Sequence, residues 1–274
     1  MSIRLVATDL DGTLMRSNGE FSVEDIGTLC RLGKLGVVRV IATGRSPYSA
    51  SRVLSPDFPI DYLVFSSGAG ILKWDTKTLV HTNEMPAALV QTIISWLCFH
   101  GIDFMVHNPI PLNHYFQYFT AGNSNPDFER RLNLYKEFAT PLIQGVPYPN
   151  PASQVVAILP NDEGMFNSLR SGVEGVKIIR ATSPIDGSSI WMEIFPETVS
   201  KASGIRWICQ NLEGVTPDQI VVVGNDYNDS DMLQLTAHSF VVGNAPELLK
   251  KSYTVVPSND SSGFSYAINK VLGM

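Results

Sequence analysis

Cysteine is scarce in this sequence, and its placement argues against a disulfide framework. Only three cysteines occur among the 274 residues, at Cys30, Cys98 and Cys209. An odd number of widely separated cysteines offers neither the pairing of a disulfide-rich domain nor a CxxC metal site. Because each lies in an apolar pattern typical of a helix, we expect all three thiols to be buried.

Long apolar runs and an excess of positive charge are also absent. No run approaches the roughly 18 apolar residues of a membrane-spanning helix, and the first residues lack the sections of a signal peptide. With 20 basic and 26 acidic residues, the net charge is -6, which does not suit a general nucleic-acid-binding protein. We expect a soluble, cytoplasmic protein that binds neither membranes nor nucleic acids; no pattern indicates its oligomeric state.

The composition is otherwise that of a folded globular protein. Hydrophobic residues make up 44% and charged residues 17% of the chain, which excludes disordered, collagen-like and coiled-coil rod proteins. At about 150 residues per domain, the length suits one large domain or two moderate ones.

Both ends of the chain alternate apolar strands with helices. This rhythm is typical of a parallel sheet. The predicted strands cover residues 3–8, 37–42, 62–65, 219–223 and 238–242, and the helices of the second part cover 201–212, a segment from about 229, and 263–272. We therefore expect an α/β core built on a doubly wound, Rossmann-like parallel sheet.

The middle of the chain follows a different rhythm. A helix-strand-strand pattern occurs twice, and turn residues between the paired strands indicate hairpins. The predicted helices cover residues 86–100, 127–138 and 162–173, and the strands cover 102–107, 114–119, 154–159, 176–181 and 189–195. We expect an inserted α+β cap domain of residues 84–196, carried by a core of residues 1–83 and 197–274.

Polar residues follow the predicted core strands where those strands end. Asp9 and Asp11 follow the first strand, Thr43 follows the second, and Asn225 follows the strand at 219–223. In an open parallel sheet, ligands bind beyond the carboxyl ends of the strands. These side chains are therefore expected to converge on one crevice.

Four motifs in this order resemble those of the haloacid dehalogenase-like phosphatases. The cap between the second and third motifs resembles the type IIB subgroup, which hydrolyses small phosphorylated metabolites. The motifs are Asp9-Leu10-Asp11-Gly12-Thr13, Thr43-Gly44-Arg45, Lys201, and Gly224-x-x-x-Asn228-Asp229. Gly68-Ala69-Gly70 marks a turn and also falls where the family carries an Asn-Gly-Ala element near the substrate, with Ser67 in place of the asparagine.

The chemistry of the first motif agrees with this resemblance. Of two carboxylates in one loop, one can attack phosphorus while the other gives a proton to the leaving oxygen and later activates water. We assign Asp9 as the nucleophile and Asp11 as the acid and base.

The next two motifs offer groups that suit a phosphoryl group in transfer. Its negative charge is spread over the equatorial oxygens, so the site needs donors and cations around them. Thr43 offers a hydroxyl, Gly44 an unshielded backbone N–H, and Lys201 an ammonium. Arg45 is expected either to bind a substrate anion or to brace the phosphate loop by pairing with a carboxylate.

The last motif is expected to contribute to a metal-binding site. Mg²⁺ prefers carboxylate and other oxygen ligands, and the resemblance implies the carboxylate of Asp9 and the backbone carbonyl of Asp11. The family usually carries Asp after the glycine of the last motif, where this chain has Asn225, so either its amide oxygen or Asp226 would complete the ligands. We favour Asn225, with Asp229 steadying a metal-bound water and Asn228 orienting Lys201 or the phosphate.

These assignments leave three functions open. The first is a Mg²⁺-dependent phosphatase that acts on small phosphomonoesters, such as sugar phosphates, through an aspartyl-phosphate. The second is a phosphomutase that resembles the phosphomannomutases, in which a sugar hydroxyl replaces water as the final acceptor. The third is a metabolite-binding protein whose catalysis has weakened through Asn225.

Overall fold

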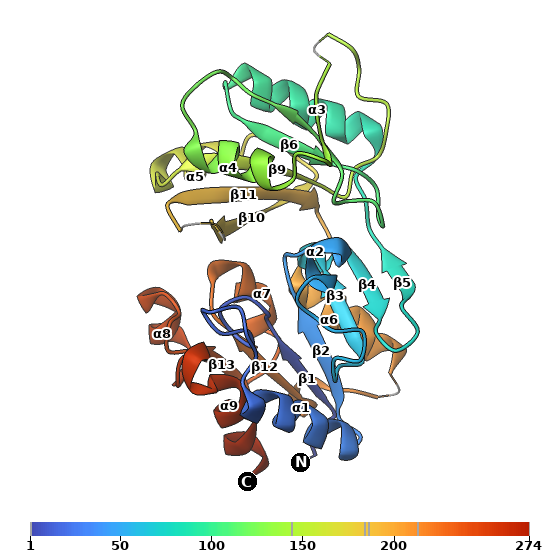
Figure 1. Ribbon diagram of the computed structural model, residues 1–274, viewed down its shortest axis with the longest axis vertical. Helices are drawn as coiled ribbons and strands as arrows, with labels where there is room; N and C mark the ends of the chain where they lie inside the picture. Colours follow the sequence, from blue (N-terminus) through green and yellow to red (C-terminus); the bar gives the residue numbers. More distant parts are fainter. Residues whose placement is uncertain (1, 144, 184, 186, 213, 274) are drawn as a thin grey trace. The chain divides into compact units, whose positions relative to one another are not determined.

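The chain folds into two compact units (Figure 1). The computed structural model describes residues 2–143, 145–183, 185, 187–212 and 214–273. One unit comprises Met1–His81 and Ser200–Met274, and the other comprises Thr82–Val199. The chain therefore passes between the units within three residues of the expected positions, after His81 rather than 83 and after Val199 rather than 196.

The first unit contains an eight-stranded sheet in the order β14-β13-β12-β1-β2-β3-β4-β5. Strand β1 (Leu5–Thr8) lies in the middle, parallel to both β12 (Ile220–Gly224) and β2 (Val38–Ala42). The remaining strands are β3 (Tyr62–Phe65), β4 (Gly70–Lys73), β5 (Thr78–Thr82), β13 (Ser239–Val242) and β14 (Thr254–Val256). The carboxyl ends of β1, β2 and β12 thus lie at one edge of the sheet.

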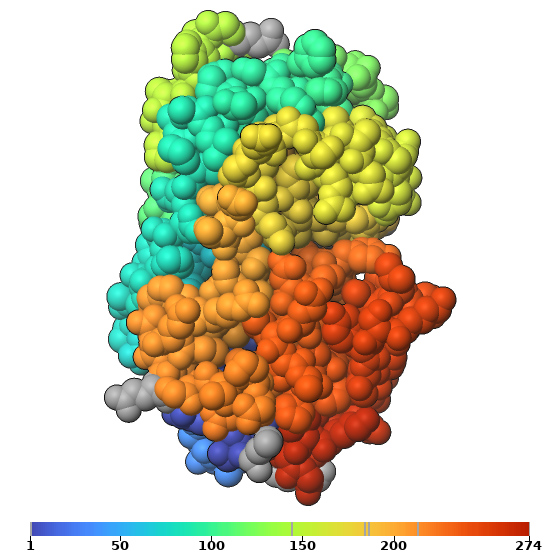
Figure 2. Space-filling model, turned by 180° about the vertical axis from the view of Figure 1, so that it is seen from behind, coloured from blue at the N-terminus to red at the C-terminus, as the bar shows by residue number. Residues whose placement is uncertain are grey.

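Helices cover both faces of this sheet. Leu5 and Ala7 of β1 pack against Ile205 of α6 (Lys201–Asn211). Helices α1 (Val23–Lys34) and α9 (Gly263–Leu272) contact each other on the opposite face (Figure 1). The shorter helices are α2 (Pro47–Ser51), α7 (Ser230–Leu233) and α8 (Glu247–Ser252). On the face of the first unit seen in Figure 2, the carboxy-terminal segment, coloured orange to red, makes up most of the surface. The doubly wound, Rossmann-like core is confirmed.

The edges of the sheet differ from the expectation. Strand β4 runs antiparallel to β3, so one edge is mixed rather than parallel. Strands β4, β5 and β14 and helix α8 were not predicted from the sequence. Strand β5 is largely exposed and β14 has only three residues, so neither shows the continuous apolar run of a buried strand.

The second unit is an α+β domain around a six-stranded sheet in the order β10-β11-β9-β6-β7-β8. Its paired strands are antiparallel except for β7 and β8. The strands are β6 (Phe104–His107), β7 (Phe116–Phe119), β8 (Ala139–Pro141), β9 (Gln154–Pro160), β10 (Val176–Thr182) and β11 (Ser189–Pro196). The two expected hairpins, β6–β7 and β10–β11, are present, whereas β8 was not expected.

The helices of the second unit pack on both faces of its sheet. Val90 of α3 (Ala87–Phe99) and Phe166 of α5 (Glu163–Leu169) share one apolar cluster with Phe104. Phe128 of α4 (Pro126–Leu134) packs with Met105 in the cluster on the other face. No helix in the part of the chain that the structure describes is long and apolar enough to cross a membrane.

The cysteines are not all buried, so that expectation was wrong. Cys30 is exposed, and Cys98 and Cys209 are only half-buried. Helix α1 buries Asp25, Thr28, Leu29 and Leu32. Successive helical residues are about 100° apart around the axis, which turns Cys30 away from that buried face.

Candidate active site

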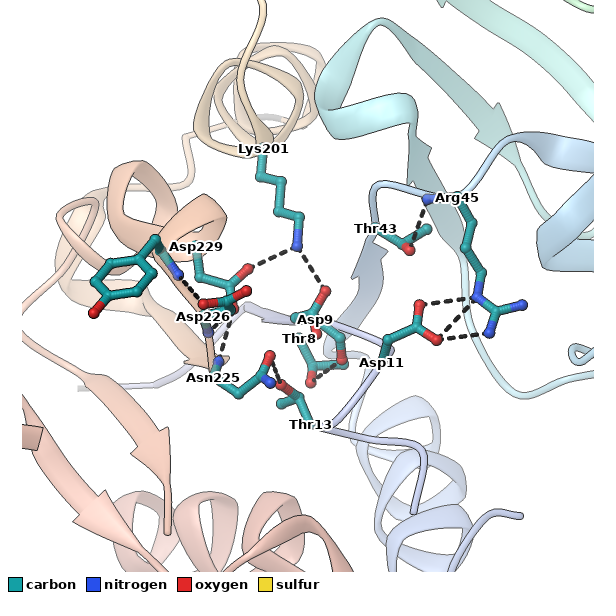
Figure 3. Close-up of polar contacts among 11 residues, drawn as sticks. Thr8, Asp9, Asp11, Thr13, Thr43, Arg45, Lys201, Asn225, Asp226 and Asp229 are labelled. Atoms are coloured by element: carbon teal, nitrogen blue, oxygen red, sulfur yellow. Dashed lines mark hydrogen bonds and ion pairs between the residues drawn. The ribbon is translucent and has the colours of Figure 1, made fainter. Parts of the chain in front are cut away.

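Loops that follow three neighbouring strands of the first unit bring the motif residues together (Figure 3). Asp9 and Asp11 follow β1, Thr43 and Arg45 follow β2, and Asn225 follows β12. Because β1 is parallel to both neighbours, these loops leave the sheet at the same edge. The sequence pattern therefore corresponds to a real cluster of side chains.

Lys201 lies at the centre of this cluster, at the first residue of α6. Its Nζ donates to Asp9 Oδ1 at 2.6 Å and to Asp229 Oδ1 at 2.7 Å. The three side chains are 1%, 7% and 0% exposed, respectively. Burial disfavours the charged ammonium, but the two carboxylates outweigh burial and raise the pKa of Lys201 above its usual value. Lys201 is therefore a fixed buried cation.

Burial and neighbouring carboxylates make it unfavourable for Asp9 to be ionised. Its pKa is raised to about 7, mainly by burial; the attraction of Lys201 opposes this rise, and the charges of Asp229 and Asp11 add to it. Its backbone N–H donates to Val223 O at 2.9 Å, which ties the start of the loop to β12. Two buried carboxylates share one ammonium, so the buried part of the site holds one surplus negative charge.

Asp229 organises the loop after β12. Its Oδ2 accepts the backbone N–H groups of Asn225 at 2.7 Å and Asp226 at 3.0 Å, while Oδ1 accepts Lys201. We expected Asn228 to orient Lys201 or the phosphate, but the Lys201 bonds described here go to Asp9 and Asp229. Asn228 lies half-buried in the short 3-10 turn Tyr227–Asp229. Asp229, the neighbour of Asn228, therefore holds Lys201, and the orientation of the phosphate by Asn228 stays a prediction.

Asp11 is held by Arg45. The guanidinium Nε lies 3.0 Å from Asp11 Oδ1 and 2.8 Å from Oδ2, and Nη2 donates to Oδ1 at 2.6 Å. The Asp11 side chain is 41% exposed and that of Arg45 is 25% exposed. The carboxylate pair considered for Arg45 is present, and it engages both oxygens of Asp11. Binding of a substrate anion by Arg45 stays a prediction.

A strained turn supports the loop after β2. Ser66, Ser67 and Gly68 have φ values of 46°, 53° and 106°, where side chains are rare. The N–H of Ser67 donates to Thr43 O at 3.0 Å, and the N–H of Ser66 donates to Arg45 O at 2.9 Å. Thr43 is fully buried, and its Oγ1 accepts the N–H of Arg45 at 3.1 Å. The loop that carries Thr43 and Gly44 is therefore fixed from within the unit.

The turn also abuts the start of α6, where Lys201 lies. A Cβ at Gly68 would collide with the backbone carbonyl of Ser200. Only glycine combines this close approach with a φ of 106°. The sequence indicated this turn in two ways, through the glycines of Gly68-Ala69-Gly70 and through their position at the family's Asn-Gly-Ala element.

Asn225 is linked to the loop after β1. Thr13 Oγ1 donates to Asn225 Oδ1 at 3.0 Å. Gly12 has a φ of +73°, and a Cβ there would lie 2.7 Å from Asn225 Nδ2. An amide oxygen has two lone pairs, so Asn225 can accept Thr13 and still offer an oxygen to a cation.

The donor set fits a hard divalent cation. No group of three or more His, Cys, Asp or Glu side chains within the described residues could hold a metal ion by itself. Mg²⁺ needs fewer, because it typically takes one or two carboxylates and completes its shell with carbonyls, waters and substrate oxygens. Asp9, the Asp11 carbonyl and the Asn225 amide are of that kind, and the surplus negative charge beside Lys201 favours a cation.

Comparisons with known proteins agree with this arrangement. Residues 6–268 match the family model of the haloacid dehalogenase-like hydrolases. A chloroplastic endoribonuclease of Arabidopsis thaliana is 27% identical over 95% of this chain, and the match spans only 45% of that protein. The 5-amino-6-(5-phospho-D-ribitylamino)uracil phosphatase of Bacillus subtilis is 22% identical over 98% of both chains.

A solved structure shares the whole fold. A sugar phosphatase of subclass IIB of the haloacid dehalogenase superfamily superposes with a TM-score of 0.78 at 18% identity, over 98% of this chain and 99% of that one. The match therefore includes the α+β unit as well as the doubly wound unit. Because the family model covers nearly the entire sequence and the fold agrees throughout, this chain belongs to the haloacid dehalogenase-like hydrolase family.

Proposed function

We propose that this protein is a Mg²⁺-dependent phosphatase that hydrolyses small phosphomonoesters, such as sugar phosphates, through an aspartyl-phosphate on Asp9. The observation that carries the proposal is the buried ammonium of Lys201, 2.6 Å from Asp9 Oδ1. A carboxylate normally repels a phosphate dianion, and a fixed cation beside it reduces that repulsion where charge accumulates. The cation is already in place before a substrate arrives.

Asp9 acts as the nucleophile. Its Oδ1 is bonded to Lys201, so Oδ2 is the oxygen that attacks phosphorus. As the new Oδ2–P bond forms, the bond from phosphorus to the ester oxygen breaks and the leaving oxygen takes a proton from Asp11. In the second half, Asp11 takes a proton from water, the water oxygen bonds to phosphorus, and the Asp9–phosphorus bond breaks.

Arg45 controls where Asp11 lies between these steps. The bidentate contact can hold the Asp11 carboxylate beside the site after the leaving oxygen has taken its proton, and Asp11 leaves Arg45 to reach the water. Because the pair is 41% and 25% exposed, separation costs only about 1 kcal/mol or less. The pair can therefore hold Asp11 in the carboxylate form that activates water without trapping it.

The phosphoryl oxygens meet donors from the loop after β2. Thr43 offers its hydroxyl and Gly44 its backbone N–H, at a position that the Ser66–Gly68 turn fixes. Asp9, the Asp11 carbonyl and Asn225 would hold Mg²⁺, with Asp229 steadying a water. The metal, when bound, supplies positive charge that neutralises the phosphate and carboxylate oxygens.

The substrate class rests on the relatives. The Bacillus subtilis relative is named for a phosphorylated ribitylamino-uracil, and the structural neighbour is a sugar phosphatase. Both names describe a phosphate on a small polyhydroxylated molecule. The α+β unit of residues 82–199 is proposed to select among such molecules.

Phosphate release from a panel of sugar phosphates and p-nitrophenyl phosphate tests the proposal. We expect turnover that requires Mg²⁺, stops with EDTA, and falls below about a hundredth of the wild-type kcat in Asp9→Asn, a barrier increase of roughly 3 kcal/mol. Asp218→Asn, at an exposed position of the same unit, is the matched control and should keep wild-type kcat. Absence of Mg²⁺-dependent hydrolysis across the panel, or an active Asp9→Asn enzyme, would overturn the proposal.

The covalent step has its own test. Asp11→Asn removes the base that activates water, so the phosphorylated enzyme should accumulate and the peptide containing Asp9 should gain the mass of one phosphoryl group. The products of turnover by the wild type separate the two enzyme functions. Formation of a second phosphorylated sugar instead of inorganic phosphate would identify a phosphomutase.

A further inference from the structure

Two asparagines outside the four motifs bind the backbone of the loop that carries Asp9 and Asp11. Asn244 Nδ2 donates to Gly12 O at 2.8 Å. Asn259 Nδ2 donates to Met15 O at 3.0 Å. These bonds join residues separated by 232 and 244 positions in the sequence, so they link the loop after β1 to the segments that follow β13 and precede α9.

The two asparagines also bind each other. The backbone N–H of Asn259 donates to Asn244 Oδ1 at 3.1 Å. The amide of Asn244 is thus used at both ends, as a donor to Gly12 and as an acceptor from Asn259, which fixes its orientation. Asn259 is only 2% exposed. We call these two residues the asparagine clamp.

The loop needs such support because of its shape. Gly12 adopts a φ of +73°, and a Cβ there would lie 2.7 Å from Asn225 Nδ2 and 3.6 Å from Asn244 Nδ2. The loop therefore passes between two side-chain amides. Its neighbour Thr13 is already bonded to Asn225, so the clamp and Asn225 hold the loop through adjacent residues.

The position of Asp11 depends strongly on this backbone. Its side chain is 41% exposed and the contacts described for it go to Arg45. When Asp11 leaves Arg45, only its backbone sets where the carboxyl can reach. A displacement of about 1 Å at a reacting group can cost about a hundredfold in rate, so a carbonyl held one residue away matters.

We propose that Asn244, oriented by Asn259, is a positioning residue that fixes the Gly12 peptide and through it the places of Asp9 and Asp11. The inference rests on the proposed phosphatase function. Asn244 touches no reacting atom. An asparagine suits the position because one end of its amide donates to a carbonyl while the other accepts an N–H. Aspartate keeps only the acceptor, and alanine keeps neither.

The experiment compares Asn244→Ala and Asn244→Asp with a matched pair at Asn211. The Asn211 amide also donates to a backbone carbonyl, that of Trp207, at 2.8 Å, and it lies at the end of α6 away from the loop. Loss of either bond should lower Tm by a similar few degrees. Both Asn244 variants should lose at least about tenfold in kcat with KM changed by less than about threefold, whereas the Asn211 variants keep both constants.

A measurement independent of turnover separates this inference from the proposed function. Hydrogen exchange of the peptide spanning Leu10–Met15 should become faster in both Asn244 variants and stay unchanged in both Asn211 variants. Unchanged exchange and kcat in Asn244→Ala would overturn the clamp. If the wild type hydrolyses no phosphomonoester, the proposed function fails and the exchange result still decides whether the clamp holds the loop.

Discussion

Replacing Asp9 with Asn should make the metal-free protein more stable while removing its activity. Asp9 and Asp229 share the single ammonium of Lys201 in a buried site, so one negative charge is in excess. An asparagine side chain has nearly the same shape and keeps an oxygen that can accept from Lys201. The substitution removes the excess charge and leaves Lys201 paired with Asp229.

The size and the pH dependence of this effect follow from the pKa of Asp9. Burial raises that pKa from 3.8 to about 7, so between these values the folded protein binds a proton that the unfolded chain has lost. Folding stability therefore falls as pH rises from about 4 to about 7 and stays lowered above it. The whole interval corresponds to at most roughly 4 kcal/mol, and about 1 to 3 kcal/mol remains after the cost of burying the amide.

Thermal unfolding in EDTA at pH 5 and pH 8.5 checks the prediction. Asp9→Asn should unfold several degrees above the wild type at pH 8.5, and the difference should shrink at pH 5, where Asp9 is already protonated. Saturating Mg²⁺ should narrow the gap at pH 8.5 because it stabilises the wild type more. A variant no more stable than the wild type at pH 8.5, or a gap of equal size at both pH values, would refute the reasoning.

Asp229→Asn should change the stability of the protein in the opposite direction to Asp9→Asn. Asp229 accepts three donors, from Lys201 and from the N–H groups of Asn225 and Asp226. An amide in its place turns one acceptor into a donor that faces another donor. The same chemical change should therefore destabilise the protein by about 1 to 3 kcal/mol, because the hydrogen bonds lost at Asp229 outweigh the relief of the surplus charge.

Other substitutions test the remaining contacts of the site. Asn225→Asp adds a carboxylate beside Mg²⁺ and should lower the concentration required for half-maximal turnover about five- to thirtyfold, a net 1 to 2 kcal/mol; an unaltered Mg²⁺ titration would point to Asp226 as the ligand. Gly68→Ala places a Cβ against the Ser200 carbonyl at a φ of 106° and should therefore lower Tm. A Tm within about 2 °C of the wild type would contradict the strain argument. Arg45→Met releases Asp11 from its ion pair. It should lower the free energy of unfolding in denaturant by less than about 1 kcal/mol but should lower kcat. A kcat equal to that of the wild type would exclude a role for the pair.

The parts of the fold that could be predicted are those that local sequence patterns encode. The predicted strand at 62–65 matches β3 at both ends, and the predicted helix at 263–272 matches α9. A short apolar run bounded by polar turns indicates a buried strand when its length and its β-branched or aromatic residues agree. A serine before a helix is also a local signal, and the Ser22 hydroxyl accepts the N–H of Asp25 at 3.1 Å at the start of α1.

The edge strands could not be predicted because they lack such local patterns. Strand β5 spans Thr78–Thr82 and has no buried residue, so it has no pattern of alternate burial to reveal it. Strand β4 follows the turn of Ser66, Ser67 and Gly68, where three consecutive positive φ values reverse the chain. Nothing in two serines indicates that conformation, since serine rarely adopts it without a surrounding structure that enforces it.

The candidate site shows the same division between local and long-range information. Motif spacing identified Asp9, Thr43 and Lys201, because each follows or begins a recognisable element. It could not indicate that Asp229 rather than Asn228 binds Lys201, since adjacent residues in a tight turn differ only in direction. Nor could it connect Asn244 with Gly12 across 232 residues. Residues that act on substrate are recognisable from their type and spacing, whereas residues that hold them in place are defined only by the folded backbone they contact.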